Sequence, residues 1–195
     1  MSASAETLSR SLQPYPAMNW FTLIQPFVDI ALLRTGPQAL PSSRFLLAVT
    51  YAGYMAIAAI TFSMRYGPAV VAATAALDVL LLTGFVAIVL DVKGQRARVL
   101  QSLTALLGSG AVLGFCVLPI QVWFMQAEHG DAINPGHVLI WLLLVGWDLL
   151  IRANVLRHAL ECSWWLSLAF SLAYFWISLR LIQTLLVAMG ALGPS

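Results

Sequence analysis

The sequence predicts an all-α fold: a polytopic membrane bundle of five transmembrane helices, preceded by an amphipathic helix at the membrane interface. Of its 195 residues, 61% are hydrophobic and only 9% are charged, whereas soluble domains carry about a quarter charged residues. A chain with so few charges cannot build a surface that faces water on all sides. Five apolar segments are each long enough to cross a bilayer core of ~30 Å, which takes about 20 helical residues.

The segment before the first span has two parts. Residues 1–17 are polar, small and interrupted by proline, and we expect a mobile tail. In residues 18–35, Thr22, Pro26 and Asp29 recur at spacings of three and four, which places them on one face of a helix. This amphipathic helix is too short and too polar to span. We expect it to break or start at the proline, and to lie in the headgroup region or docked under the bundle. The alternative is a cap that covers the ends of the spans.

The five-helix transmembrane domain is expected to occupy residues 44–192, with short polar connections. Its spans are predicted at about 45–64, 69–90, 101–124, 137–156 and 164–190. The second span, AVVAATAALDVLLLTGFVAIVL, carries a single charge, Asp78, near its middle. No internal repeat is evident, and an odd number of spans argues against two equal halves.

The positions of the basic residues predict the orientation, because cytoplasmic loops of membrane proteins are rich in Lys and Arg. Only Arg65 falls on the side of the membrane that holds the C-terminus. Eight basic residues fall on the side of the N-terminus: Arg10, Arg34, Arg44, Lys93, Arg96, Arg98, Arg152 and Arg157. We therefore expect a multi-pass membrane protein with its N-terminus in the cytoplasm and its C-terminus outside.

Three ionisable residues fall at a similar depth in their spans. With a rise of ~1.5 Å per residue, Asp78, Asp148 and Arg180 each lie ~15 Å from the outer end of a helix. A charge at that depth costs several kcal/mol, so it should face protein and have a partner. The best partner for Asp78 is Arg180, and Arg152 is placed at i+4 to pair with Asp148. Asp78, Asp148, Arg152 and Arg180 have two possible roles. They form an ion-pair network that fixes helix packing, or they form a site that relays a proton or ion or binds a polar substrate.

Two weaker patterns concern packing and lipid. Gly110 and Gly114 form a GxxxG pattern, which allows close helix approach. We expect it to serve packing within the bundle, with self-association as the alternative. The cluster of Lys93, Arg96 and Arg98 determines topology, and the alternative is contact with anionic lipid.

The sequence predicts no catalytic, metal or cofactor site. His129 and His137, with Glu128 and Asp131, match no metal-ligand spacing. Neither HExxH nor GxSxG occurs. The net charge of +2 is too small and too dispersed to indicate nucleic acid. We expect a protein that is not an enzyme and whose partners are the lipid bilayer and other membrane proteins or further copies of itself.

The connection between the second and third spans resembles bacterial members of the Yip1-type family of small five-span membrane proteins. Residues 91–108 read DVKGQRARVLQSLTALLG, a Gly/basic loop that leads into a helix bearing Gln and Thr, and Pro119 follows late in that helix. The topology is also similar: a cytoplasmic N-terminus with an amphipathic stretch, five spans, short loops and an external C-terminus. Eukaryotic members carry a DLYGP-like motif before the first span, where this chain has only RTGP at residues 34–37. That difference argues against a role in vesicle trafficking or with small GTPases.

The resemblance implies a non-enzymatic membrane scaffold or adaptor that binds lipid or protein partners. It also implies a place in the bacterial inner (plasma) membrane, where the external C-terminus would be periplasmic. The alternative is a small transporter, or an accessory subunit of a proton- or ion-handling complex, that uses Asp78, Asp148 and Arg180. The similar depth of the three charges favours this alternative. The lack of repeats and of paired Gly/Pro helix breaks argues against it.

Overall fold

The computed structural model describes residues 20–127 and 135–191, and every regular element in these two ranges is helical. Five helices are long and apolar enough to cross a membrane, which confirms the predicted all-α fold of five spans. The elements are α2 (Trp20–Ala31), the 3₁₀ turn η1 (Pro37–Ala39), α3 (Arg44–Ser63), α4 (Pro68–Val92), the 3₁₀ turn η2 (Arg96–Arg98), α5 (Val99–Ala127), α6 (Pro135–Leu160) and α7 (Trp164–Ala188). The tail expected at residues 1–17, and the loop residues Glu128, His129 and Asp131, lie outside the described ranges.

Serine or proline stands at the start of four of the spanning helices, α3, α4, α6 and α7. The Ser43 hydroxyl accepts a hydrogen bond from the backbone N–H of Leu46 at 3.3 Å and so caps α3. Ser163 caps α7 in the same way through the N–H of Leu166 at 3.4 Å. Pro68 opens α4, where its missing N–H leaves no donor unsatisfied. The two serine caps satisfy N–H groups that a helix end would otherwise leave without partners.

Four helices end at a residue with left-handed backbone. Gly94 after α4 and Gly190 after α7 have φ of 72° and 68°, which glycine adopts without strain. Leu33 after α2 and Glu161 after α6 have φ of 61° and 50°, a conformation that costs other residues roughly 1–2 kcal/mol. Tertiary contacts hold both of these turns, because Leu33 packs against the core and Glu161 pairs with Arg98.

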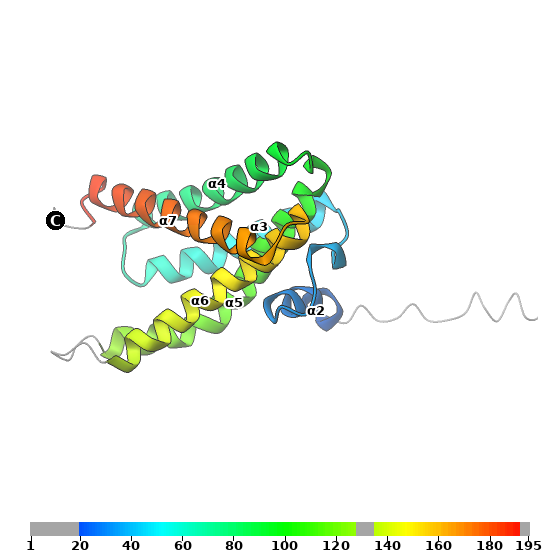
Figure 1. The fold of residues 1–195 in the computed structure, drawn as a ribbon. Coiled ribbons are helices and arrows are strands. Elements are labelled where there is room, and N and C mark those ends of the chain that lie inside the picture. The colour runs from blue at the N-terminus through cyan, green and yellow to red at the C-terminus, as the bar shows by residue number, and fades with distance from the viewer. Residues whose placement is uncertain (1–19, 128–134, 192–195) are drawn as a thin grey trace, which may run out of the picture.

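The five spanning helices form a ring in which each packs against two neighbours, in the order α3, α4, α7, α6, α5 and back to α3; α4 also contacts α5 across the ring. Figure 1 shows α5 and α6 running together and diverging from α4 and α7 along their length. We call the end with η1 and residues 93–98 and 161–163 the closed end. The opposite end, with the α3–α4 turn at residues 64–67, is the open end.

The hydrophobic core lies toward the closed end. In α5, every residue from 102 to 109 is buried, whereas none from 110 to 126 is. In α6, buried residues begin only at Ile151, and none of residues 135–150 is buried. The halves of α5 and α6 that lead to the open end are therefore only partly covered by other helices, and a cavity lies beside them.

The N-terminal helix α2 is docked on the side of the bundle. The ring of Phe27 lies over Gly108 of α5, where an added Cβ would come within 2.2 Å of it. Trp147 of α6 donates its indole N–H to the carbonyl of Ala31 at 3.0 Å. The structure shows the helix docked on the protein, with Leu23 on its exposed face.

One expectation for this helix is wrong. The helix neither breaks nor starts at Pro26, which lies inside α2. Proline removes a single hydrogen bond from a helix and strains the turn before it. The burial of Phe27 and Ile30 against the bundle offsets that loss, since Ile30 is fully enclosed.

Candidate functional site

The carboxylate of Asp78 on α4 lies among hydroxyl groups from two other helices. The Tyr54 hydroxyl of α3 donates to it at 2.6 Å. From α7, the hydroxyls of Tyr174 and Ser178 donate at 3.2 Å and 3.4 Å. Three helices of the ring thus meet at one acidic side chain. Hydroxyl donors supply the compensation that a carboxylate needs inside a membrane bundle.

The predicted pairing of Asp78 with Arg180 is not what the structure shows. The buried face of α7 carries Ser171, Tyr174 and Ser178, which recur at spacings of three and four. Arg180 follows Ser178 by two residues, which is roughly 200° around the helix at ~100° per residue. It is therefore exposed, and its guanidinium lies over the ring of Trp176, 4.8 Å from the centroid.

Asp148 and Arg152 pair on α6, as their i,i+4 spacing predicts. The Arg152 Nε donates to an Asp148 oxygen at 2.6 Å. The side chain of Arg152 is 15% exposed and that of Asp148 is 26% exposed. The same guanidinium lies 4.9 Å from the centroid of the Tyr174 ring. Because Tyr174 also donates to Asp78, the ion pair and the hydroxyl cluster are connected through one tyrosine.

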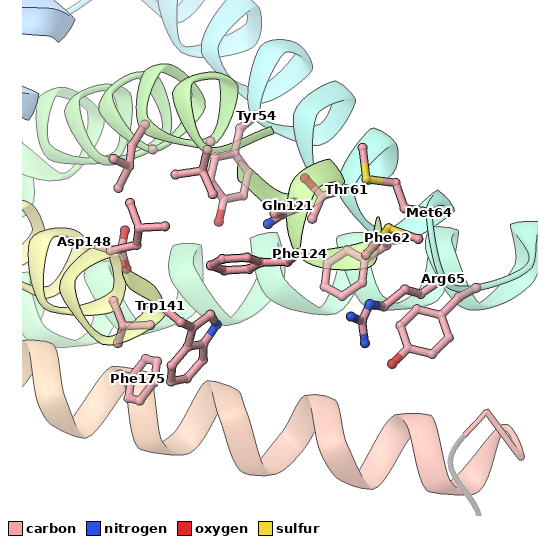
Figure 2. Close-up of a pocket in the computed structure, with 18 of the residues that line it drawn as sticks. Tyr54, Thr61, Phe62, Met64, Arg65, Gln121, Phe124, Trp141, Asp148 and Phe175 are labelled. Atoms are coloured by element: carbon pink, nitrogen blue, oxygen red, sulfur yellow. The ribbon is translucent and has the colours of Figure 1, made fainter. Parts of the chain in front are cut away.

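A cavity of about 740 Å³ lies beside this network, between α3, α5 and α6. Figure 2 shows aromatic rings along it, with Asp148 toward one end and Arg65 toward the other. Tyr54, Asp148 and Arg152 line the cavity and also belong to the network. Its other walls are mainly apolar and aromatic, and include Phe62, Leu113, Val117, Phe124, Trp141, Leu144, Val145 and Phe175.

The two glycines of the GxxxG pattern pack α5 against α3. A Cβ on Gly110 would lie 2.9 Å from the Tyr54 ring, and one on Gly114 would lie 2.7 Å from Ile57. The pattern therefore serves close helix approach within the bundle. Gly110 also lets the Tyr54 ring sit between α5 and Asp78, so this glycine helps to position the hydroxyl.

The basic cluster at the closed end is largely paired with protein. Arg96 pairs with Asp91. Arg98 pairs with Glu161 at 2.5 Å and also donates to the carbonyls of the last turn of α6. Arg98 thereby ties the α4–α5 connection to the end of α6. Lys93 caps α4 and is exposed, so among these three it is the residue best placed to meet an anionic lipid.

Reasoning from charge alone missed the hydroxyl partners of Asp78. The signal was available in α7, where Ser167, Ser171, Tyr174 and Ser178 repeat at spacings of four, three and four. Such a stripe of small and polar residues in an apolar helix indicates a face that packs on other helices. No comparable pattern in α3 identifies Tyr54 as a partner of Asp78. The position of its ring depends on the space that Gly110 leaves on α5.

The sequence matches no known protein family, no curated protein and no solved structure. The fold, composition and five long apolar helices define a multi-pass membrane protein.

Proposed function

We propose that the protein is a non-enzymatic, Yip1-type scaffold or adaptor of the bacterial inner membrane that binds a lipid-like amphiphile in the cavity between α3, α5 and α6. The observation that carries the proposal is the lining of this cavity, in which aromatic and aliphatic walls run between charged groups. An amphiphile has the matching chemistry, because its apolar body contacts the walls and its polar group meets the charges.

The size and exposure of the cavity support a guest of this kind. Its volume of about 740 Å³ lies within the range of roughly 300–1,000 Å³ that is typical of ligand pockets. Trp141, on the wall from α6, is half exposed, as is expected where a cavity is open to lipid. The ion pair of Asp148 and Arg152 offers both signs of charge to a polar group.

The distribution of charge supports the proposed orientation. Arg34, Arg44, Lys93 and Arg157 lie toward the closed end with the paired Arg96 and Arg98, whereas Arg65 lies at the open end. Basic residues favour the cytoplasmic side. The closed end and the N-terminus would then face the cytoplasm, and the cavity would lie in the outer half of the membrane.

Retention of lipid by purified protein tests the proposal. Val117→Trp places a large ring on the cavity wall, whereas Phe115→Trp changes the same helix on its exposed side. After reconstitution with phosphatidylglycerol and phosphatidylethanolamine and exhaustive washing in detergent, we expect retained lipid in the parent protein and in Phe115→Trp. We expect its loss in Val117→Trp. Equal lipid content in all three proteins would contradict the proposal.

A second candidate function, proton-linked transport, is favoured by the position of Tyr54. Its ring lines the cavity and its hydroxyl bonds Asp78, so a guest in the cavity would be one side chain away from a carboxylate that can bind a proton. Asp78 and Asp148 are the residues that this function would use. Arg180 faces away from them.

Proteoliposomes that contain a pH-sensitive dye test this second candidate. If the protein moves protons, an imposed membrane potential changes the internal pH. Asp78→Asn abolishes the change, whereas Asp91→Asn at the closed end leaves it intact. No pH change in the parent protein would reject proton transport and would leave the binding proposal untouched.

A further inference from the structure

Arg180 is a cation on the exposed face of a spanning helix. Its side chain is turned away from the bundle, and the neighbours Ile177 and Leu181 on that face are apolar and exposed. An arginine that faces lipid inside the hydrocarbon region is costly and is expected to find an anion, water or protein. The described part of the chain offers no carboxylate within ion-pair distance of this guanidinium.

The guanidinium points toward the middle of the helix. A helical side chain leans toward the N-terminus of its own helix, and here the group lies over the ring of Trp176, one turn back. Trp176 is at the midpoint of α7, which has 25 residues, so ~18 Å of helix separates it from either end. The structure therefore does not show this arginine reaching toward either headgroup layer. This position favours a protein anion over a lipid phosphate.

A second copy of this chain does not supply that anion. In a twofold dimer through this face, Arg180 would meet Arg180, and like charges repel. Two of the described carboxylates, Asp78 and Asp148, lie at mid-span, and both are engaged inside the ring. The others lie near the closed end.

We propose that this face of α7 docks a transmembrane helix of a different protein that carries an aspartate or glutamate near the middle of its span. Arg180 pairs with that carboxylate, and Trp176, which is 57% exposed, supplies apolar contact area beside it. Trp and Arg are the residues that most often dominate interfaces. The proposal does not depend on the cavity, because neither residue lines it.

Energy transfer between the protein and a designed helix tests the proposal. The probe is a fluorescent transmembrane peptide of leucine and alanine with one central glutamate, and the control peptide carries glutamine there. Both are reconstituted in phosphatidylcholine vesicles with the full chain, labelled on an N-terminal tag. We expect the glutamate peptide to associate roughly three- to twenty-fold more tightly than the glutamine peptide, the range that interhelical polar contacts give in membranes.

Variants of the protein locate the contact. Arg180→Leu is expected to remove the difference between the two peptides, and Arg180→Lys to retain part of it. Lys93→Leu, which removes a positive charge at the closed end, is expected to leave the difference unchanged. Arg180 is exposed, so its replacement should not disturb the fold, and the thermal unfolding of each variant in detergent checks this.

Two results would overturn the proposal. Equal association of both peptides with the parent protein would show that the face does not select a carboxylate. If, in addition, Arg180→Leu lowered the retention of phosphatidylglycerol, the face would be assigned to lipid phosphate. A glutamate preference that survives Arg180→Leu would place the contact elsewhere and would also reject the proposal.

Discussion

The hydroxyl of Tyr54 donates to Asp78 at 2.6 Å and joins α3 to α4 across 24 residues of sequence. The ring that carries this hydroxyl lies against Gly110 of α5. A glycine on one helix, a tyrosine on a second and an aspartate on a third therefore depend on one another. The cavity wall and the polar network share this tyrosine, so changes to it act on both.

We predict energetic coupling between Tyr54 and Asp78. Asp78→Leu leaves the Tyr54 hydroxyl without an acceptor, which typically costs about 1–3 kcal/mol for a buried polar group. Tyr54→Phe removes that hydroxyl, so the double variant should recover part of the loss. Unfolding by SDS should give a coupling of about 0.6–1.7 kcal/mol, the range for polar contacts between membrane helices.

The same measurement with Arg180 is the control. Because Arg180 is exposed and stacked on Trp176, Asp78→Leu and Arg180→Leu should be additive within about 0.5 kcal/mol. Strong coupling of Asp78 to Arg180, with none to Tyr54, would mean that the two charges pair in the membrane.

The spans could be predicted from sequence because each is a property of one continuous apolar segment. The partner of Asp78 could not, since it depends on which face of α7 is turned inward. Charge complementarity pointed to Arg180, whereas the repeat of Ser171, Tyr174 and Ser178 marks the buried face. The pair of Asp148 and Arg152 was within reach of the sequence, because i,i+4 geometry is local to one helix.

A second prediction concerns the pair on α6. Arg152→Leu leaves Asp148 without its partner at the cavity wall. Breaking a fully buried pair costs about 3–5 kcal/mol, and we expect the lower end, since Asp148 is still 26% exposed. Replacing both residues by leucine removes the orphan charge and should restore most of the stability. A double variant as unstable as Arg152→Leu would show that the orphan charge is not the cause of the loss. Other contacts of Arg152, such as that with the Tyr174 ring, would then account for it.

A third prediction concerns the glycines of α5. Gly110→Ala places a methyl group 2.9 Å from the Tyr54 ring, and Gly114→Ala places one 2.7 Å from Ile57. Overpacking of this kind costs about 1–3 kcal/mol. Thermal unfolding in detergent should show both variants destabilised. Gly110→Ala should in addition weaken the coupling of Tyr54 to Asp78, because the ring must move.

Gly146 of α6 is the matched control, since an added Cβ there meets nothing within 4 Å. Gly146→Ala should be neutral or stabilising by up to about 1 kcal/mol, because alanine is the better helix former. If Gly110→Ala and Gly146→Ala behave alike, the approach of α3 and α5 is looser than the structure shows.

The placement of α2 could be predicted only in part. Its amphipathic pattern indicates a helix that does not span. Where it docks depends on the space above Gly108 and on the indole of Trp147, which lie in distant parts of the sequence. Nothing in residues 18–35 identifies these two contacts. Proline at position 26 suggested a break, yet tertiary packing overrides that local preference.

The docking of α2 gives a last prediction. Phe27→Ala removes the ring that fills the space over Gly108, and such a truncation in a packed site costs about 3–5 kcal/mol. A short helix held mainly by Phe27, Ile30 and one indole hydrogen bond should then undock, while the five spans stay folded. Hydrogen exchange of the α2 amides should accelerate strongly, with little change in α4 or α5. Ile24→Ala, on the half-exposed face of the same helix, should leave exchange unaltered. Equal acceleration in both variants would mean that α2 is held by the bilayer and not by its contact with α5.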